Sequence, residues 1–337
     1  METPLILPTD KQVELDEGYQ KTHKNFDELL PTLPTRKGWW MHQLFQYQGF
    51  WLSAFGIRGI MLVHDHFKPR PTDIIVATSP KCGTTWLKAL VFSIINRDSY
   101  DFSDHPLSKA SHQDLMILLE LHIHGSGSTS LVDGLASPRV ISTHIPYSLF
   151  PERMTEGSSP CRFVYLCRDP KDVLVSKWHF SNKVRPEELP PLTLDEAFES
   201  FCQGVSHEGP FWDHVLGYWK ASLESPEKVL FFKYEDVKKQ PWGCVRKVAE
   251  FLGVPFSEEE ENKGVVGEIV KLCSFEKMSS LDVNKRDTRN RERPVSNSDF
   301  FRKGEVRDWV NHLSPQMAEK LDQITEQKLQ GTGLSFH

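Results

Sequence analysis

The sequence has little cysteine and no long hydrophobic run. Its six cysteines are scattered and form no Cys-x-x-Cys pair, so we expect reduced thiols rather than disulfides or a zinc site. No apolar run approaches the roughly 18–20 residues that a membrane-spanning helix needs. The first residues also lack the basic region and apolar core of a secretory signal. These absences predict a soluble, cytoplasmic protein with no membrane partner.

An excess of positive charge is also absent. The chain has 40 Lys and Arg residues and 46 Asp and Glu residues, which leaves a formal net charge of −6. This balance argues against general binding to nucleic acid, while a local basic site for a small anion remains compatible with it. His105, His112, His122 and His124 lack the paired spacing and acidic partners of a metal site. We therefore predict no bound metal and expect these histidines to lie in a solvated loop.

The sequence does contain enough apolar residues for one core. It has 337 residues, of which 39% are hydrophobic and 11% aromatic, and it shows no internal repeat or dividing linker. Residues 1–36 are polar and proline-spaced, so a partly ordered N-terminal arm is expected there, followed by a single domain over residues 37–337. The many aromatic residues between 37 and 70 are expected to pack in the core, with a ligand-facing wall as the alternative.

Residues 73–88 give the clearest local signal. An apolar run with three β-branched aliphatic residues predicts a buried strand, Pro80 and Gly83 then interrupt it, and a helix is expected from the two threonines that follow. The free N–H groups of a helix N-terminus, with Lys81 beside them, suit an anion. An ordinary turn with a surface lysine is the alternative. Because the lysine precedes the glycine, this is not the loop of standard nucleotide triphosphatases.

Three further strands are expected, over residues 139–146, 162–172 and 228–234. They alternate with helical stretches, which predicts an α/β fold with a mainly parallel central sheet flanked by helices. His144 and Arg168 follow strand ends, so they are expected at the carboxyl edge of the sheet, where ligands bind. A structural histidine and an arginine paired with a carboxylate are the alternatives.

The remaining chain is expected to be mostly helical. Helices are predicted over residues 171–180, 194–204, 211–223, 258–272 and 314–329. Residues 284–293 are rich in basic side chains and lack apolar periodicity, so a mobile loop is expected. Arg302 and Lys303 add two cations beside Gly304, a residue that lets the backbone approach an anion closely.

Four elements of this chain, in this order, resemble those of cytosolic sulfotransferases. They are Pro80-Lys81-Cys82-Gly83-Thr84-Thr85-Trp86, Thr143-His144-Ile145-Pro146, Tyr165-x-x-Arg168-x-Pro170-Lys171-Asp172-x-x-x-Ser176 and Phe301-Arg302-Lys303-Gly304. The stretches Leu272-Cys273-Ser274-Phe275-Glu276 and Gly209-Pro210-Phe211-Trp212 are most similar to the plant branch. The resemblance extends over nearly the whole chain and leans towards enzymes that act on flavonols or hydroxyjasmonates.

The resemblance implies one α/β domain with a P-loop-like phosphosulfate-binding loop and a defined co-substrate. The enzyme would transfer the sulfuryl group of 3′-phosphoadenosine 5′-phosphosulfate (PAPS) to a hydroxyl of a small molecule, leaving adenosine 3′,5′-bisphosphate (PAP), without a metal. The residues implied at the 5′-phosphosulfate are Lys81, Cys82, Gly83, Thr84 and Thr85. Those implied at the 3′-phosphate are Arg168, Ser176, Arg302, Lys303 and Gly304. Those implied at the adenine are Trp86, Phe275 and Tyr234.

The resemblance also implies catalytic roles. Neutral His144 would take the proton of the acceptor hydroxyl, Lys81 would stabilise the leaving nucleotide, and Ser176 would hold Lys81 away until an acceptor arrives. The acceptor is expected to be a flat or apolar alcohol or phenol, such as a flavonoid, hydroxyjasmonate or brassinosteroid. Candidate acceptor contacts are Tyr147, Phe180 and Phe211.

Three departures from the family pattern leave other interpretations open. Cys82 replaces a serine of the loop, and Ser142 stands where animal members carry a lysine. Pro315 disrupts the animal dimer motif, which favours a monomer. A catalytically impaired nucleotide-binding protein of the same fold therefore remains an alternative. A P-loop kinase is a weaker one, because no strand ends in an obvious magnesium-binding aspartate.

Overall fold

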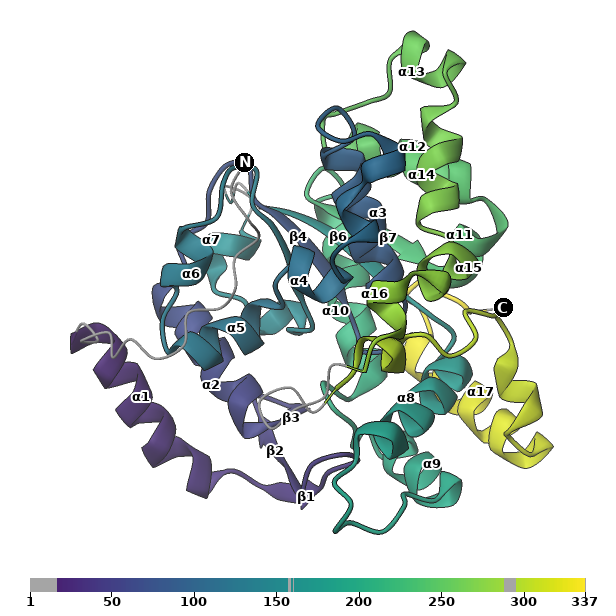
Figure 1. Cartoon of the computed structure of the whole chain (residues 1–337). Coiled ribbons are helices and arrows are strands. Elements are labelled where there is room, and N and C mark those ends of the chain that lie inside the picture. Colours follow the sequence, from purple (N-terminus) through teal and green to yellow (C-terminus); the bar gives the residue numbers. More distant parts are fainter. Residues whose placement is uncertain (1–16, 157–158, 160, 288–294, 337) are drawn as a thin grey trace.

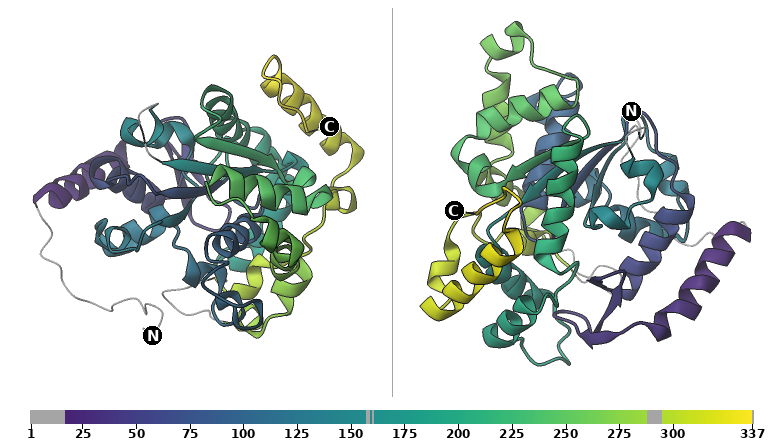
Figure 2. Two further views of the ribbon diagram at one scale, coloured as in Figure 1. Left: turned by 90° about the horizontal axis from the view of Figure 1, so that it is seen from above. Right: turned by 180° about the vertical axis from the view of Figure 1, so that it is seen from behind.

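The computed structural model describes residues 17–156, 159, 161–287 and 295–336. At its centre lies a four-stranded sheet in the order β5-β4-β6-β7, in which all neighbouring strands are parallel (Figure 1). The strands are β4 (Ile74–Thr78), β5 (Val140–Thr143), β6 (Arg162–Cys167) and β7 (Val229–Lys233). Helices lie on both sides of this sheet, which confirms the predicted α/β class (Figure 2).

The helices account for most of the remaining chain. In chain order they are α1 (Glu17–Leu29), η1 (Leu30–Thr32), α2 (Ala54–His66), α3 (Thr84–Ile95), η2 (Phe102–Asp104), η3 (Pro106–Ser108), α4 (His112–Leu115), α5 (Leu119–Ser126), α6 (Ser130–Asp133), η4 (Tyr147–Leu149), α7 (Glu152–Thr155), α8 (Pro170–Val184), α9 (Leu194–Cys202), α10 (Phe211–Glu224), α11 (Tyr234–Lys239), α12 (Pro241–Phe251), α13 (Glu258–Asn262), α14 (Val265–Leu272), α15 (Phe275–Ser280), α16 (Asp282–Lys285), η5 (Asn297–Phe300), η6 (Asp308–Asn311) and α17 (Pro315–Leu329). Ser314 caps α17 with its side chain, as its position before a proline predicts.

Alternate residues of the central strands face two separate hydrophobic clusters. Ile75 and Ala77 of β4 pack with residues of α8 and α10 on one face of the sheet. Ile74 and Val76 pack with residues of α3, α12 and α14 on the other face. All five residues of β4 are buried, which explains why its sequence is a continuous apolar run rather than an alternating one.

This arrangement creates a switch point between β4 and β6. The helix that follows β4 packs on one face of the sheet, whereas the helix that follows β6 packs on the opposite face. In open α/β sheets, ligands bind outside the carboxyl ends of the strands at such a point. The loops that follow Thr78 and Cys167 leave the sheet there, so the fold places both beside the expected anion site.

A second, three-stranded antiparallel sheet was not predicted from the sequence. It consists of β1 (Thr35–Lys37), β2 (Gln43–Tyr47) and β3 (Phe50–Leu52). The aromatic segment lies here, and Trp39, Phe50 and Trp51 are buried, which confirms the expectation of core packing for these three. Helix α1 lies alongside α2 at the periphery and buries Phe26 (Figures 1 and 2).

Several local predictions were wrong. His105 and His112 are buried rather than solvated, because the surrounding chain folds into short helices that cover them. The predicted helix over residues 258–272 is two helices, because Gly264 adopts a left-handed conformation (φ +75°) between them. The expected loop over residues 284–293 begins inside α16, and residues 288–293 lie outside the described part of the chain. All six cysteines are free thiols, as predicted.

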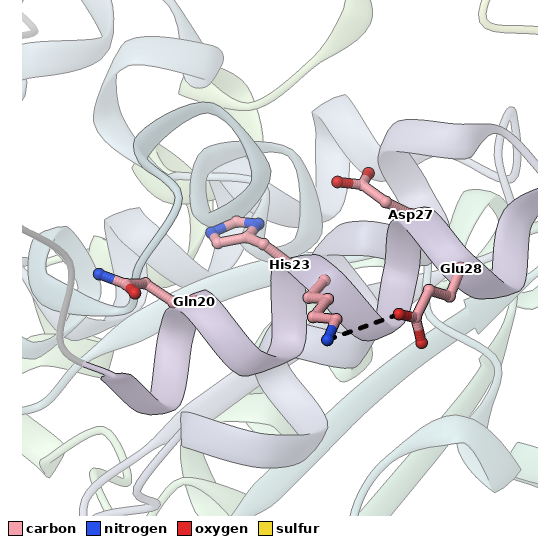
Figure 3. Close-up of a pocket in the computed structure, with 5 residues that line it drawn as sticks. Gln20, His23, Asp27 and Glu28 are labelled. Atoms are coloured by element: carbon pink, nitrogen blue, oxygen red, sulfur yellow. Dashed lines mark ion pairs between the residues drawn. The ribbon is translucent and has the colours of Figure 1, made fainter.

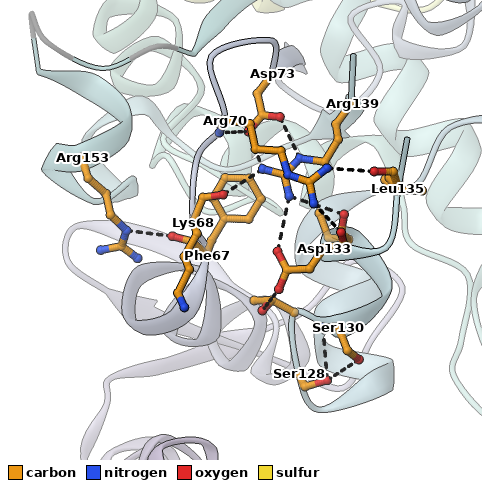
Figure 4. A network of polar contacts seen from close by, with 12 residues as sticks. Phe67, Lys68, Arg70, Asp73, Ser128, Ser130, Asp133, Leu135, Arg139 and Arg153 are labelled. Atoms are coloured by element: carbon orange, nitrogen blue, oxygen red, sulfur yellow. Dashed lines mark hydrogen bonds and ion pairs between the residues drawn. The ribbon is translucent and has the colours of Figure 1, made fainter. Parts of the chain in front are cut away.

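A buried ion pair fixes the end of the sheet opposite the site. Arg139 donates to both carboxylate oxygens of Asp73, at 2.7 and 2.5 Å, and both side chains are fully buried (Figure 4). Arg139 also donates to Lys68 O at 2.8 Å, and the Arg70 N–H donates to Asp73 at 2.7 Å. The pair joins the residues preceding β4 and β5, so it helps to set the register of the two strands that carry the site residues.

Candidate active site

The loop over residues 79–83 connects β4 to α3 at the carboxyl edge of the sheet. Lys81 and Gly83 both have positive φ angles, +72° and +105°, which turn the backbone sharply before α3 begins at Thr84. A Cβ atom at Gly83 would lie 3.0 Å from side-chain atoms of both Leu166 and Tyr234. Glycine is therefore required here for conformation and for space. The tight turn directs the first N–H groups of a 12-residue helix towards this edge, as an anion site needs.

His144 follows β5 and lies next to the end of β4. Its Nδ1 atom is 2.7 Å from the carbonyl oxygen of Thr78. A carbonyl can only accept, so Nδ1 must carry the proton and Nε2 keeps a free lone pair. Burial lowers the pKa of His144 to about 4, with smaller contributions from Lys177, Lys88 and Lys81. At neutral pH the ring is uncharged and can accept a proton at Nε2.

The peptide groups on both sides of His144 are held by buried side chains. The N–H of His144 donates to Glu120 at 2.9 Å, and the hydroxyl of Thr143 donates to the same carboxylate at 2.9 Å. The carbonyl oxygen of His144 lies 3.0 Å from Nε2 of His214, whose Nδ1 is 3.0 Å from the hydroxyl of Tyr165. These contacts fix the backbone that carries the imidazole. No sequence pattern indicated Glu120 or His214, which lie far from His144 along the chain.

Lys81 lies above an aromatic ring and near other cations. Its Nζ atom is 3.9 Å from the ring centroid of Phe180 and 5.7 Å from that of Phe300. Burial, followed by the positive charges of Arg168 and Arg302, lowers the pKa of Lys81 to about 7. An anion bound among these cations would offset their repulsion and favour the protonated ammonium.

Arg168 lies at the end of β6, and a second group of cations lies on a loop after η5. Arg168 donates to Glu305 O at 2.6 Å, and its guanidinium is 4.9 Å from the ring centroid of Tyr234. Arg302 and Lys303 donate to the buried carboxylate of Asp308, at 2.5 and 2.6 Å. Burial alone would raise the pKa of Asp308, but the hydrogen bonds from Lys303 and Arg302 hold it well below its usual range.

Two donors in this region suit an anionic ligand. The Nε atoms of Arg168 and Arg302 are buried, and neither has a hydrogen-bond partner within the described ranges. Buried polar groups normally have partners, so these two N–H groups suit the oxygens of an anion. Ser176 is buried on α8, two turns after the start of that helix.

The residues expected at the adenine come from three elements. Trp86 is in the first turn of α3, Tyr234 begins α11 and Phe275 begins α15. The hydroxyl of Tyr234 donates to Gly304 O at 3.1 Å. A Cβ atom at Gly304 would lie 2.5 Å from the ring of Phe275, and Gly304 has a positive φ of +66°. The structure thus brings Tyr234, Phe275 and Gly304 together.

The three residues expected at the acceptor differ in their positions. Phe180 contacts Lys81 through its ring face. Tyr147 packs against Phe163 and Tyr218, and its hydroxyl donates to Thr155 O at 3.3 Å. Phe211 is only 1% exposed and packs against other aromatic rings. The structure therefore places Phe180 beside the catalytic candidates, and it places Phe211 in the core.

A surface cavity formed by described residues adjoins the site. A cavity of about 430 Å³ is lined by His179, Asn182, Lys183, Arg302, Lys303 and His312. A larger one, of about 570 Å³, is lined by residues of α1, among which Lys24 and Glu28 form an exposed ion pair (Figure 3). The second cavity lies on a peripheral helix and contains none of the site residues.

Within the described residues there is no cluster of three or more potential metal ligands, and no helix is long and apolar enough to span a membrane.

Comparisons with known proteins agree with this geometry. The family model described as "Sulfotransferase domain" matches residues 71–333. Cytosolic sulfotransferase 15 of Arabidopsis thaliana is 44% identical over 329 residues, covering 96% of this chain and 90% of that protein. The crystal structure of an Arabidopsis thaliana putative steroid sulphotransferase superimposes with a TM-score of 0.72 at 37% identity, covering 97% of this chain and 100% of that one. Mouse sulfotransferase SULT7A1 complexed with PAP matches with a TM-score of 0.65 at 25% identity, covering 86% and 94% of the two chains.

Proposed function

Because the chain belongs to the plant cytosolic sulfotransferase family and is a PAPS-dependent sulfotransferase, we propose that His144 and Lys81 catalyse its transfer step. The acceptor would be a hydroxylated small molecule, and the sulfuryl group would pass to its oxygen. The observation that carries this proposal is the hydrogen bond between His144 Nδ1 and Thr78 O, which leaves Nε2 free as a base. A pKa of about 4 keeps this base unprotonated at neutral pH.

The proposed reaction is a direct displacement at sulfur. His144 Nε2 takes the proton of the acceptor hydroxyl while the acceptor oxygen forms a bond to sulfur. The bond between sulfur and the bridging oxygen breaks, and its electron pair stays on the 5′-phosphate of the nucleotide. Lys81 donates a hydrogen bond to that bridging oxygen and stabilises the charge that develops on it. We propose no metal, because arginine and lysine side chains supply the positive charge.

We propose that PAPS lies across the carboxyl edge of the sheet. The residues proposed to hold its 5′-phosphosulfate are Lys81, Cys82, Gly83, Thr84 and Thr85. Those proposed at the 3′-phosphate are Arg168, Ser176, Arg302, Lys303 and Gly304, and those at the adenine are Trp86, Tyr234 and Phe275. Support comes from the partnerless Nε atoms of Arg168 and Arg302 and from the grouping of Tyr234, Phe275 and Gly304. Ser176 is proposed to hold Lys81 in reserve until an acceptor is present.

Two of the departures from the family pattern have structural correlates. Cys82 is fully buried, and burial raises the pKa of its thiol to about 12, so it remains a neutral thiol. The hydroxyl of Ser142 donates to Ile117 O at 2.6 Å and is also buried, so it supplies no cation at the sulfuryl group. We propose that the backbone N–H groups of the 79–83 loop and Lys81 provide the stabilisation that these two positions do not.

The remaining features of the proposal concern the acceptor and the setting. We propose a flat or apolar alcohol or phenol, with Phe180 as a contact and a flavonoid, hydroxyjasmonate or brassinosteroid as the class. A role in plant secondary or hormone metabolism would follow. The relatives named cytosolic sulfotransferases support a cytoplasmic location. We also propose a monomer that binds neither nucleic acid nor membranes. The expected division into an arm (1–36) and one domain (37–337) stays a prediction; its boundary falls within β1, and residues 1–16 lie outside the described part of the chain.

Ligand stabilisation is the direct test. PAP should raise the melting temperature strongly in the absence of magnesium, whereas ATP and AMP should not. His144→Ala should keep the PAP response and lose transfer to any acceptor, since the base does not hold the nucleotide. Lys24→Ala, on the exposed outer side of α1, serves as the control and should change neither property. Preference for ATP, or near wild-type turnover by His144→Ala, would contradict the proposal. PAP binding without transfer by the wild type would indicate the impaired binding protein instead.

A further inference from the structure

A tight turn over residues 206–209 lies between α9 and α10, and the inference drawn from it rests on the function proposed above. The turn is fixed to the edge of β3. The N–H of Glu208 donates to Trp51 O at 2.9 Å, and the N–H of Trp51 donates to Gly209 O at 2.7 Å. Glu208 adopts a positive φ of +58°, which is strained for a residue with a side chain. The surrounding contacts thus hold this turn in one conformation.

A continuous series of contacts joins this turn to Lys81. The Nζ atom of Lys81 lies 3.9 Å from the ring centroid of Phe180, and the rings of Phe180 and Trp40 are perpendicular with centroids 5.7 Å apart. Trp40 in turn stacks on the ring of His207, with centroids 3.3 Å apart and planes 8° from parallel. The turn therefore forms one end of an aromatic wall whose other end is the catalytic lysine. An acceptor lying along this wall, with its reacting hydroxyl near Lys81, would extend towards His207.

Helix α8 supports the turn from behind. Lys177, adjacent to Ser176, is fully buried, and its Nζ donates to His207 O at 2.7 Å and to Ser206 Oγ at 3.2 Å. Burial is the main cause that lowers the pKa of His144 and of His207, and the positive charge of Lys177 lowers both further. The turn and the proposed base therefore share one electrostatic environment.

The turn presents polar atoms that lack partners. His207 is 1% exposed, and neither of its ring nitrogens has a hydrogen-bond partner among the described residues. Oε2 of Glu208 is buried and also has no partner in the described part of the chain, although the residue itself is partly exposed. Buried polar atoms of native proteins are nearly always paired, so three such atoms on adjacent residues indicate a missing ligand.

We propose that His207 and Glu208 form a specificity site for the acceptor, and that they bind a second hydrogen-bond donor, a hydroxyl or an amine. Oε2 of the Glu208 carboxyl group accepts a hydrogen bond from this donor, and one ring nitrogen of His207 pairs with the same group. The donor lies at the end of the acceptor that is remote from the sulfated hydroxyl. An acceptor without this group leaves the polar atoms of the turn unpaired, and it is therefore disfavoured.

Matched pairs of acceptors test this site. Kaempferol and galangin differ only in the 4′-hydroxyl, and 17β-estradiol is compared with its 17-deoxy analogue. For each pair, kcat/KM is measured with labelled PAPS, and binding to the enzyme–PAP complex is measured by calorimetry. The variants are Glu208→Gln, which keeps the shape of the side chain, and His207→Phe, which keeps the stack on Trp40. Glu188→Gln, an exposed glutamate on the loop after α8, is the matched control.

The wild type and Glu188→Gln should favour the donor-bearing member of at least one pair by roughly 10- to 100-fold, the range for leaving a buried polar group unpaired. Both turn variants should reduce that preference to within about threefold, with the change mainly in KM. The deoxy member should react with the turn variants at least as well as with the wild type, because the original polar atoms are no longer left unpaired beside it, and PAP should stabilise all four proteins. These results would support the specificity site.

Other outcomes overturn the inference. One is that the wild type shows no preference for the donor-bearing acceptor, either because both members of each pair bind equally or because neither binds. The other is that this preference survives in both turn variants. If PAP still stabilises the wild type in these cases, only the specificity site is wrong. If PAP fails to stabilise the wild type and no acceptor is sulfated, the proposed function is wrong as well.

Discussion

Nucleotide binding should take up a proton at Lys81. Burial and neighbouring cations lower the pKa of this lysine from 10.5 to about 7 in the free protein. At pH 8 only about one Lys81 side chain in ten is then protonated. The phosphate groups of PAP bring negative charge to the same place, which favours the ammonium and moves its pKa back towards the ordinary value. Binding at pH 8 should therefore be accompanied by an uptake of about 0.9 proton per site.

The same linkage sets the pH dependence of affinity. Above the pKa of free Lys81, each further pH unit lowers the protonated fraction of the free lysine about tenfold, and binding must supply the missing proton. The association constant of PAP should thus fall about tenfold per pH unit between about pH 7.5 and 9. The phosphates of PAP no longer titrate in this range, because their second ionisation lies near pH 6.

Calorimetry in buffers of different ionisation enthalpy measures the proton uptake directly. Lys81→Arg is the matched variant, since its guanidinium stays protonated at every pH used, and its uptake should fall to nearly zero. An uptake below about 0.2 proton in the wild type at pH 8 would refute the reasoning, because Lys81 would then be charged before the ligand arrives. An equal uptake in the variant would assign the proton to another group.

Three further predictions concern stability and catalysis. Arg139→Ala should lower the free energy of unfolding in urea by roughly 3–5 kcal/mol, because it leaves the Asp73 carboxylate buried and unpaired; a loss below about 1 kcal/mol would contradict this. Gly83→Ala should weaken PAP binding about tenfold or more in calorimetry, because the positive φ and the 3.0 Å contacts oppose a Cβ atom; unchanged affinity would show that the loop relaxes freely. Glu120→Gln should reduce kcat about 10- to 100-fold with little change in the KM for PAPS, since it loosens the peptide that carries His144; a change confined to KM would count against this role.

The sequence predicted the central sheet because its strands are short apolar runs bounded by turn residues. It also placed Lys81, His144 and Arg168 at strand ends, where the topology brings them to one edge. These features depend on local pattern and on general rules for parallel sheets. They can therefore be inferred from one chain.

The partners of these residues could not be predicted in the same way. Glu120 and His214 hold the backbone of His144, yet nothing in their local sequence indicates that contact. The three residues of β1 are all exposed and show no alternation, so the second sheet left no periodic signal. His105 was expected in a solvated loop, but it is buried by neighbouring short helices. That burial depends on tertiary packing, which the local sequence pattern does not encode.

Thr78 has a consequence for how the reaction is aligned. Its carbonyl oxygen accepts the hydrogen bond from His144, while its hydroxyl lies 2.6 Å from that of Thr84, at the start of α3. The proposed base and the helix proposed to bind the anion are thus both positioned from one residue. The relative placement of the proposed proton acceptor and the proposed phosphosulfate site is therefore referred to a single residue at the tip of β4.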